Sequence, residues 1–264
     1  MTDEVRLVDG PAATKPVKIK PWLPYWAVFR EDMRQTVRSW VYRTWVFVSV
    51  LTAIGYMHYR VAEFRGAGIV KHASDLLSDL LRWCVLGSVT LIIVLTAGCI
   101  SAERGTLADS VLSRGISRYQ YFLGKWHARL VIVLGTFLAM GLVVVVASVF
   151  LLHGDVQWIG SFFALLAVAC ILAIVISCGV SMSAVFSNSL LGIAVVWILV
   201  YGAGFVLWLL PLHYPPQFHV LSSLPYILRG EYHFAVLGRL VVWSATVSCG
   251  LAIFGLAYFS RRDV

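Results

Sequence analysis

The sequence predicts an all-α integral membrane protein with six transmembrane helices, and two observations lead to this fold class. The 264 residues are 60% hydrophobic and only 13% charged, with a mean hydropathy of +0.85. Such a chain has too little polar surface to cover a water-soluble globule. The second observation is a set of apolar runs, each close to the roughly 20 residues that a helix needs to cross a bilayer. These runs cover residues 40–57, 83–100, 130–152, 159–185, 190–210 and 236–259.

The segment before the first run divides into two parts. We expect residues 1–20 to form a disordered cytoplasmic tail and residues 21–39 to form an amphipathic interfacial helix. In the second part, apolar side chains recur at helical spacing and charged ones fall between them. The apolar positions are Trp22, Trp26, Phe29, Met33 and Val37, and the basic positions are Arg30, Arg34 and Arg38. Both a simple membrane anchor and a mechanical role at a partner interface fit this helix.

Residues 40–264 form the predicted six-span domain. The first run is the weakest because Arg43 interrupts it. An arginine near a helix end can extend its guanidinium to the lipid headgroups, so we retain this run as a span. The interiors of the other five runs contain no Asp, Glu, Lys or Arg, whereas ion-coupled transporters usually place such residues at mid-membrane. Secondary transport is therefore disfavoured.

The distribution of lysine and arginine predicts the orientation. Fifteen of them fall on one side, with eight in residues 1–43, five between Arg104 and Arg129, and two at Arg261 and Arg262. The other side carries six. Both termini are therefore expected in the cytoplasm, with the chain in the inner (cytoplasmic) membrane. The net charge of +8 then reflects topology and contact with anionic membrane lipid, with no nucleic acid as a partner.

A polar hairpin at residues 103–125 separates two of the most apolar runs. Thr106 with Asp109 matches a capping box, which starts a short helix. Ser117 with Gln120 matches a second box, which opens a helix that runs unbroken into the third span. The short helix carries an apolar stripe with no soluble domain in this chain to cover it, so we infer that a partner docks there. An inert, solvated loop is the alternative.

Several residues of the hairpin also form a recognisable pattern. They are Glu103, Gly105, Thr106, Leu107, Leu112, Ser113, Ser117, Arg118, Gly124 and Lys125. This pattern resembles the cytoplasmic loop of ABC transporter permeases of the type-2 export class. The six spans, the cytoplasmic termini and the preceding amphipathic helix are also similar to that family. One departure is Gly115, which ends the predicted short helix where the family usually has proline two residues before the Ser-Arg pair.

The resemblance implies the transmembrane subunit of an ATP-driven exporter. Residues 106–114 would form a coupling helix that docks in a separate P-loop ATPase, two copies of which would bind ATP and Mg²⁺. A second copy of the chain, or a related permease, would complete the translocation path. The residues implied in ATPase coupling are Glu103, Gly105, Thr106, Leu107, Asp109, Val111, Leu112, Gly115, Ser117, Arg118, Gly124 and Lys125. The stretch LSSLPY at 221–226 is similar to the family's short outer helices, with Pro225 expected to open one.

Other functional classes fit the sequence less well. No G-x-x-x-x-G-K-[ST] loop is present, so we do not expect this chain to be an enzyme or to hold a cofactor of its own. The main alternative is a membrane scaffold or assembly factor that docks a cytoplasmic partner without transport. A channel would need pore-lining polar rings, and the spans supply only scattered Ser, Thr and Asn.

Two smaller features carry competing interpretations. The stretch GVSMS at 179–183 offers a serine nucleophile, but serines in spans more often bond to backbone. Six of the seven histidines fall on the predicted outer side, which leaves a metal or haem contact open there, although no pair has compact ligand spacing. The five cysteines lie in or at the ends of spans and resemble small packing residues.

Overall fold

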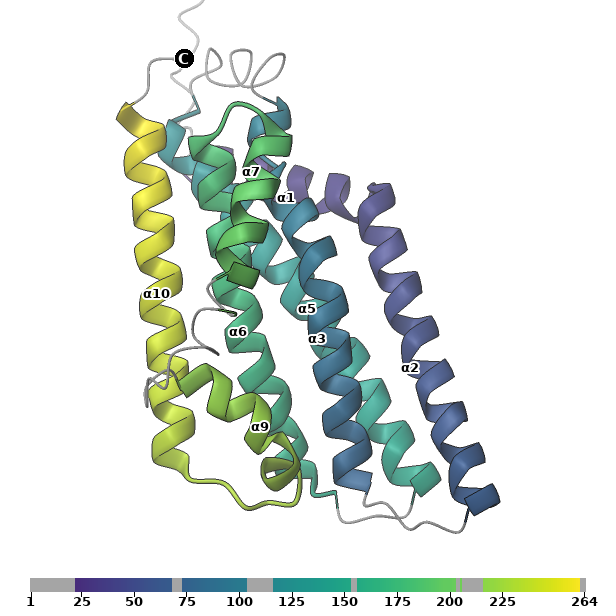
Figure 1. Cartoon of the computed structure of the whole chain (residues 1–264). Coiled ribbons are helices and arrows are strands. Elements are labelled where there is room, and N and C mark those ends of the chain that lie inside the picture. Colours follow the sequence, from purple (N-terminus) through teal and green to yellow (C-terminus); the bar gives the residue numbers. More distant parts are fainter. Residues whose placement is uncertain are drawn as a thin grey trace, which may run out of the picture.

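The chain folds as a bundle of helices (Figure 1). The computed structural model describes residues 22–67, 73–103, 116–152, 156–202, 205 and 216–261, and no β-strand occurs among them. The elements are α1 (Leu23–Arg38), α2 (Trp40–Ala67), α3 (Ala73–Ala97), the 3-10 helix η1 (Ser101–Glu103), α5 (Arg118–Leu152), α6 (Trp158–Val185), α7 (Ser189–Trp197), the π-helix η2 (Ile198–Gly202), α9 (Pro216–Leu228) and α10 (Phe234–Arg261). The predicted all-α class is confirmed for these residues.

Among the described residues, four helices are long and apolar enough to cross a membrane. They are Ala73–Glu103, Arg118–Phe150, Trp158–Val185 and Phe234–Arg261. Each coincides with one predicted span, namely 83–100, 130–152, 159–185 and 236–259. Apolar helices of this length need lipid around them. The structure therefore indicates a multi-pass membrane protein.

The other two predicted spans differ from these four. The first, 40–57, lies within α2, which is 28 residues long but less apolar because of its aromatic and charged side chains. The fifth, 190–210, begins with α7 and η2, which together form an apolar helix over Ser189–Gly202, and residues 203, 204 and 206–210 of this run lie outside the described part of the chain. The described part of the chain thus has four apolar helices of membrane length where the sequence predicts six.

A sharp corner makes α1 a helix separate from α2. Ser39 at the corner has an extended backbone, with φ −64° and ψ 143°. Its Oγ accepts a hydrogen bond from the Tyr42 backbone N–H at 3.2 Å. This is the bond of an N-cap residue, so α2 starts in a new direction. α1 occupies the segment predicted as the amphipathic helix, and it packs along α5.

The core forms around α6. Apolar residues cover this helix on all sides, as expected for a helix enclosed by protein, and it packs against α3, α5, α9 and α10. Small residues allow close approach, since Gly179 lies against Thr96 of α3 and Gly255 of α10 lies against Ser181. Ser181 Oγ also donates a hydrogen bond to the Leu251 carbonyl of α10 at 2.7 Å.

The start of α5 and the end of α10 lie side by side. Arg118 Nη1 donates to the Ser260 carbonyl at 3.2 Å, and the Tyr121 ring stacks on Phe259 with 6.1 Å between centroids. α1 lies across this same end, and α9 lies at the other end (Figure 1). We call them the α1 end and the α9 end of the bundle.

The structure corrects one prediction at the α9 end. Pro225 does not open a helix, because α9 begins at Pro216 and Pro225 lies inside it. A proline has no N–H for the carbonyl four residues earlier, here that of Leu221. Arg82 of α3 supplies the missing donor, since its Nε bonds to the Leu221 carbonyl oxygen at 2.9 Å. This side chain compensates the internal proline.

Candidate functional site

Four charged side chains meet at the α1 end of the bundle. Asp32 of α1 receives two bases from α5, Lys125 and Arg129. Lys125 Nζ lies 3.1 Å from Asp32 Oδ1, and Arg129 Nη2 donates to the same oxygen at 3.1 Å. Arg129 Nε lies 3.0 Å from Asp32 Oδ2, an ion pair without hydrogen-bond alignment. α1 is therefore fixed to α5 by a shared carboxylate.

Glu103 of η1 is the fourth member of this set. Lys125 Nζ donates to Glu103 Oε1 at 2.7 Å and to the Cys99 carbonyl at 3.1 Å. The Tyr121 hydroxyl donates to Glu103 Oε2 at 2.8 Å. We call Asp32, Glu103, Lys125 and Arg129 the charge cluster. It joins α1, η1 and α5 with two acids and two bases.

The charge cluster is largely shielded from solvent. Asp32 and Lys125 are each 2% exposed and Arg129 is 7% exposed, while the Glu103 side chain is 21% exposed. Removing ions from water costs several kcal/mol each, and only opposite charges with further hydrogen bonds offset this cost. Arg129 Nη1 makes such a bond, to the Leu95 carbonyl of α3 at 3.2 Å. The four groups therefore depend on one another.

Gly124 allows α1 to reach the charge cluster. A Cβ at this position would lie 2.9 Å from Val28 Cγ1 and 3.3 Å from the Tyr25 carbonyl oxygen, both on α1. Any larger residue would push α1 away from α5. The Tyr25 hydroxyl meets His127 Nδ1 at 3.1 Å. Burial raises the pKa of Tyr25 above its ordinary value of 10.0, so this hydroxyl is neutral at physiological pH.

The start of α5 has the predicted capping box. The Ser117 backbone N–H donates to Gln120 Oε1 at 3.2 Å, and the Gln120 backbone N–H donates to Ser117 Oγ at 3.2 Å. These reciprocal bonds satisfy two N–H groups at the helix end. α5 then runs without a break from Arg118 to Leu152. The prediction of one continuous helix through Gly124 and Lys125 is confirmed.

Serine side chains of α6 and α7 position η1. Ser183 Oγ accepts hydrogen bonds from the backbone N–H groups of Ile100 at 2.8 Å and Ser101 at 3.0 Å. Ser101 Oγ lies 2.9 Å from Ser189 Oγ at the start of α7. Two serines of the GVSMS stretch, Ser181 and Ser183, therefore bond to the backbone of neighbouring elements.

The residues predicted in ATPase coupling fall into three groups. Glu103, Gly124 and Lys125 are brought together at the charge cluster. Ser117 and Arg118 lie at the start of α5, where the Arg118 guanidinium bonds to α10. The remaining residues lie outside the described part of the chain, and these are Gly105, Thr106, Leu107, Asp109, Val111, Leu112 and Gly115.

The predicted interfacial residues lie on the outward faces of α1. Trp22, Trp26 and Val37 are exposed, with exposed fractions of 56%, 60% and 48%, and Phe29 and Met33 are half-buried. Arg30, Arg34 and Arg38 are exposed. The buried face of α1 is a third face, formed by Asp32 and Thr36.

Sequence reasoning missed Asp32, Tyr121 and Arg129. Periodicity places Asp32 outside the apolar stripe of α1, where an acid usually faces solvent. The sequence did contain one indication of a buried acid. Lys125 and Arg129 are four residues apart and share a face of a helix that enters an apolar span. Two buried bases on one face require an acid from elsewhere.

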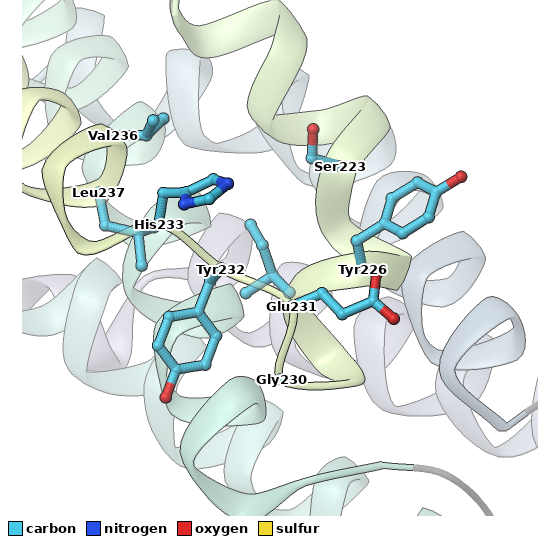
Figure 2. Close-up of a pocket in the computed structure, with 9 residues that line it drawn as sticks. Ser223, Tyr226, Gly230, Glu231, Tyr232, His233, Val236 and Leu237 are labelled. Atoms are coloured by element: carbon cyan, nitrogen blue, oxygen red, sulfur yellow. The ribbon is translucent and has the colours of Figure 1, made fainter.

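A separate pocket of about 500 Å³ lies at the α9 end (Figure 2). It is lined by Ser223, Tyr226, Ile227, Gly230, Glu231, Tyr232, His233, Val236 and Leu237. His233 is one of the histidines considered for a metal or haem contact. The described residues contain no group of three or more His, Cys, Asp or Glu side chains that could hold a metal ion.

Comparison with known proteins gives no assignment. No protein-family model matches the chain, and no curated protein matches it significantly.

Proposed function

We propose that this chain is the transmembrane subunit of an ATP-driven ABC exporter of the type-2 export class. In this proposal it has six spans, resides in the inner (cytoplasmic) membrane and has both termini in the cytoplasm. It pairs with a second copy or a related permease to form the translocation path. Two copies of a separate P-loop ATPase bind ATP and Mg²⁺ and act on the permease through residues 103–125.

The charge cluster is the observation that carries this proposal. Glu103 and Lys125 stand at the two ends of the 103–125 hairpin, and they are bonded directly to each other. Lys125 also bonds to Asp32 of α1. A force applied to this hairpin would reach η1, α5 and α1 together. Networks of packed side chains and ion pairs carry energetic coupling between distant sites, and the charge cluster is such a network.

The junction also explains how a small displacement becomes a change of state. Packed cores and buried ion pairs have discrete arrangements and do not deform continuously. Binding and release of ATP in the partner would favour one arrangement of the charge cluster over another. The alternation would open the path between two permease copies to one side of the membrane and then to the other.

The cargo class follows from the chemistry of the helices. Exposed side chains on α2, α7 and α10 are mostly apolar or aromatic, including Phe47, Trp197 and Trp243. A path built from such surfaces favours a lipid-like or amphipathic cargo over a small ion. Transport assays in vesicles in which only hydrophilic cargo moves would contradict this part of the proposal.

Crosslinking tests the proposed partner. Val111→Cys, on a background with the native cysteines replaced, is treated with a thiol-reactive crosslinker in native membranes, and the captured protein is identified by mass spectrometry. Glu231→Cys at the α9 end, which is exposed, is the matched control. We expect the first variant to capture a P-loop ATPase and the control to capture none.

A second readout separates the exporter from a scaffold. If the ATPase is captured, its hydrolysis rate is compared with the intact permease and with Glu103→Gln. An exporter predicts a changed rate, because Glu103 accepts bonds from Lys125 and Tyr121. An unchanged rate, or capture of a protein without a P-loop, would favour a scaffold or assembly factor that docks a partner without transport.

A further inference from the structure

Three arginines form a row on the outward face of α1. Arg30, Arg34 and Arg38 are spaced four residues apart, so they project from the same face of the helix. All three are exposed, and together with Met33 and Val37 they line one open groove. Within the described part of the chain, no ion-pair partner is found for any of them. Among the described residues, the row therefore presents three guanidinium groups without an acidic partner.

The two acids of α1 form no ion pair with this row. Asp32 is turned to the opposite side, where Lys125 and Arg129 hold it in the charge cluster. Glu31 accepts a hydrogen bond from Gln35 Nε2 at 3.3 Å. The outward face of α1 is therefore positively charged, although α1 itself contains two acids.

The position of α1 indicates what this face meets. Trp22, Trp26 and Trp40 are exposed beside the row, with exposed fractions of 56%, 60% and 79%. Exposed tryptophans of this kind concentrate at the headgroup level of a bilayer. α1 also lies at the end of the membrane-length helices (Figure 1). Both features favour a position of the guanidinium groups close to the lipid phosphates.

We propose that Arg30, Arg34 and Arg38 form a binding site for the headgroups of anionic phospholipids. A guanidinium presents a planar set of donors that matches a phosphate in a bidentate way. The eight residue steps from Arg30 to Arg38 give the row a length of about 12 Å. The adjoining apolar side chains, Met33 and Val37, contact the upper part of the acyl chains.

Lipid bound at this row would also restrain the helix that contributes Asp32 to the charge cluster. Asp32 lies on the buried face of the same helix that carries the arginines. A headgroup held by the row would fix α1 on its outer side while Lys125 and Arg129 fix it on its inner side. If the proposed function holds, anionic lipid would thereby influence coupling to the ATPase, but the binding site itself does not depend on that function.

The test uses the purified full chain with no other protein present. It is reconstituted with mixed phosphatidylcholine and phosphatidylglycerol, stripped of loosely held lipid, and the retained lipids are quantified by mass spectrometry. The variant carries Arg30→Gln, Arg34→Gln and Arg38→Gln. The control carries Arg239→Gln, an exposed arginine near the start of α10 and away from the α1 end, and its charge-matched counterpart in the row is the single variant Arg34→Gln.

We expect the wild type and the control to retain phosphatidylglycerol in preference to phosphatidylcholine. The row variant should lose this preference by roughly tenfold or more, because each arginine near an anionic surface contributes a factor of about five. High salt should weaken the preference of the wild type. Glu31→Gln, which removes the adjacent acid, should strengthen it.

Two results would overturn the proposal. Equal retention of phosphatidylglycerol by the row variant and the control would show that these arginines do not select anionic lipid. Unchanged lipid retention combined with loss of a captured ATPase in native membranes would assign the row to an acidic protein surface instead. The lipid measurement is made on the isolated chain, so its outcome is independent of whether an ATPase partner exists.

Discussion

The two ends of the bundle are each crossed by a helix, and they hold that helix by different means. At the α1 end, Asp32 binds α1 to two buried bases. At the α9 end, α9 packs on α6 and α3, and its Leu224, Ile227 and Leu228 are buried, with exposed fractions of 0%, 5% and 0%. The strength of an ion pair depends on the charges around it, whereas apolar packing is non-directional and has no charge that can respond to them. The comparison suggests a switchable junction at one end and a fixed one at the other.

Backbone geometry reinforces the α9 end. Gly230 has a φ of +91°, and the Glu231 N–H bonds to the Tyr226 carbonyl at 2.9 Å. This is the Schellman ending of a helix, which favours glycine at the left-handed position. The Gln157 N–H bonds to the Leu228 carbonyl at 2.9 Å and connects the start of α6 to α9. None of these bonds involves a charged side chain.

The largest expected effect is at Asp32. Asp32→Asn keeps the shape of the side chain but removes the acid that Arg129 pairs with and leaves Lys125 with Glu103. Loss of one partner from a buried ionic set typically costs about 3–5 kcal/mol. Unfolding of the purified protein, followed by circular dichroism in detergent, measures the change.

Glu31→Gln is the matched control for this prediction. Glu31 is adjacent in sequence, exposed and outside the charge cluster, so its substitution should change the free energy of unfolding by less than about 0.5 kcal/mol. Similar losses for the two variants would mean that the charge cluster contributes no more than a surface acid. The α1 end would then not depend on buried ion pairs, and the proposed difference between the two ends would be wrong.

An intermediate effect is expected at Gly160, where α6 meets α9. An added Cβ at this position would press against the carbonyl oxygens of Ile227 and Leu228. Backbone cannot move aside as a flexible side chain does, so Gly160→Ala should destabilise the fold by about 1–3 kcal/mol. The same unfolding measurement applies.

Gly135→Ala in α5 is the control for Gly160. Nothing lies within 4 Å of a Cβ at Gly135, so alanine should only remove backbone freedom and stabilise the helix by up to about 1 kcal/mol. A lower free energy of unfolding for Gly160→Ala together with a higher one for Gly135→Ala would confirm that close helix contact holds α9. Two changes of the same sign would contradict it.

The sequence could predict those parts of the fold that depend on local pattern. The apolar runs indicate four of the described helices, and Ser117 with Gln120 indicates the start of α5. Asp32 and Lys125 illustrate what local pattern cannot show, because these residues are 93 positions apart in the chain. Their pairing depends on how α1 crosses α5, which no periodicity specifies.

Pro225 failed as a helix start for a related reason. Proline is common at the first turn of a helix. The residues around Pro225 give no further indication of where in the helix this proline lies. The stabilising group is Arg82, which lies on another helix and bonds to the Leu221 carbonyl. A local rule was overridden by a tertiary contact.

The smallest expected effect is at the rim of the α9 end, where Arg229 pairs with Asp75. Arg229 Nη2 lies 3.1 Å from Asp75 Oδ1, and the two side chains are 28% and 44% exposed. Water screens such a pair, so its interaction energy should be at most about 1 kcal/mol. Arg229 also donates to Ser74 Oγ at 2.8 Å. The loss measured for Arg229→Ala alone would therefore be larger than the interaction energy of the ion pair.

A double-mutant cycle of Arg229→Ala and Asp75→Ala removes the contribution of Ser74. The same cycle on Asp32→Asn and Arg129→Gln gives the corresponding energy for the charge cluster. We expect the second interaction energy to be clearly larger, and the first to decrease in high salt because exposed charges are screened. Equal interaction energies in the two cycles would show that burial adds nothing to the strength of the charge cluster.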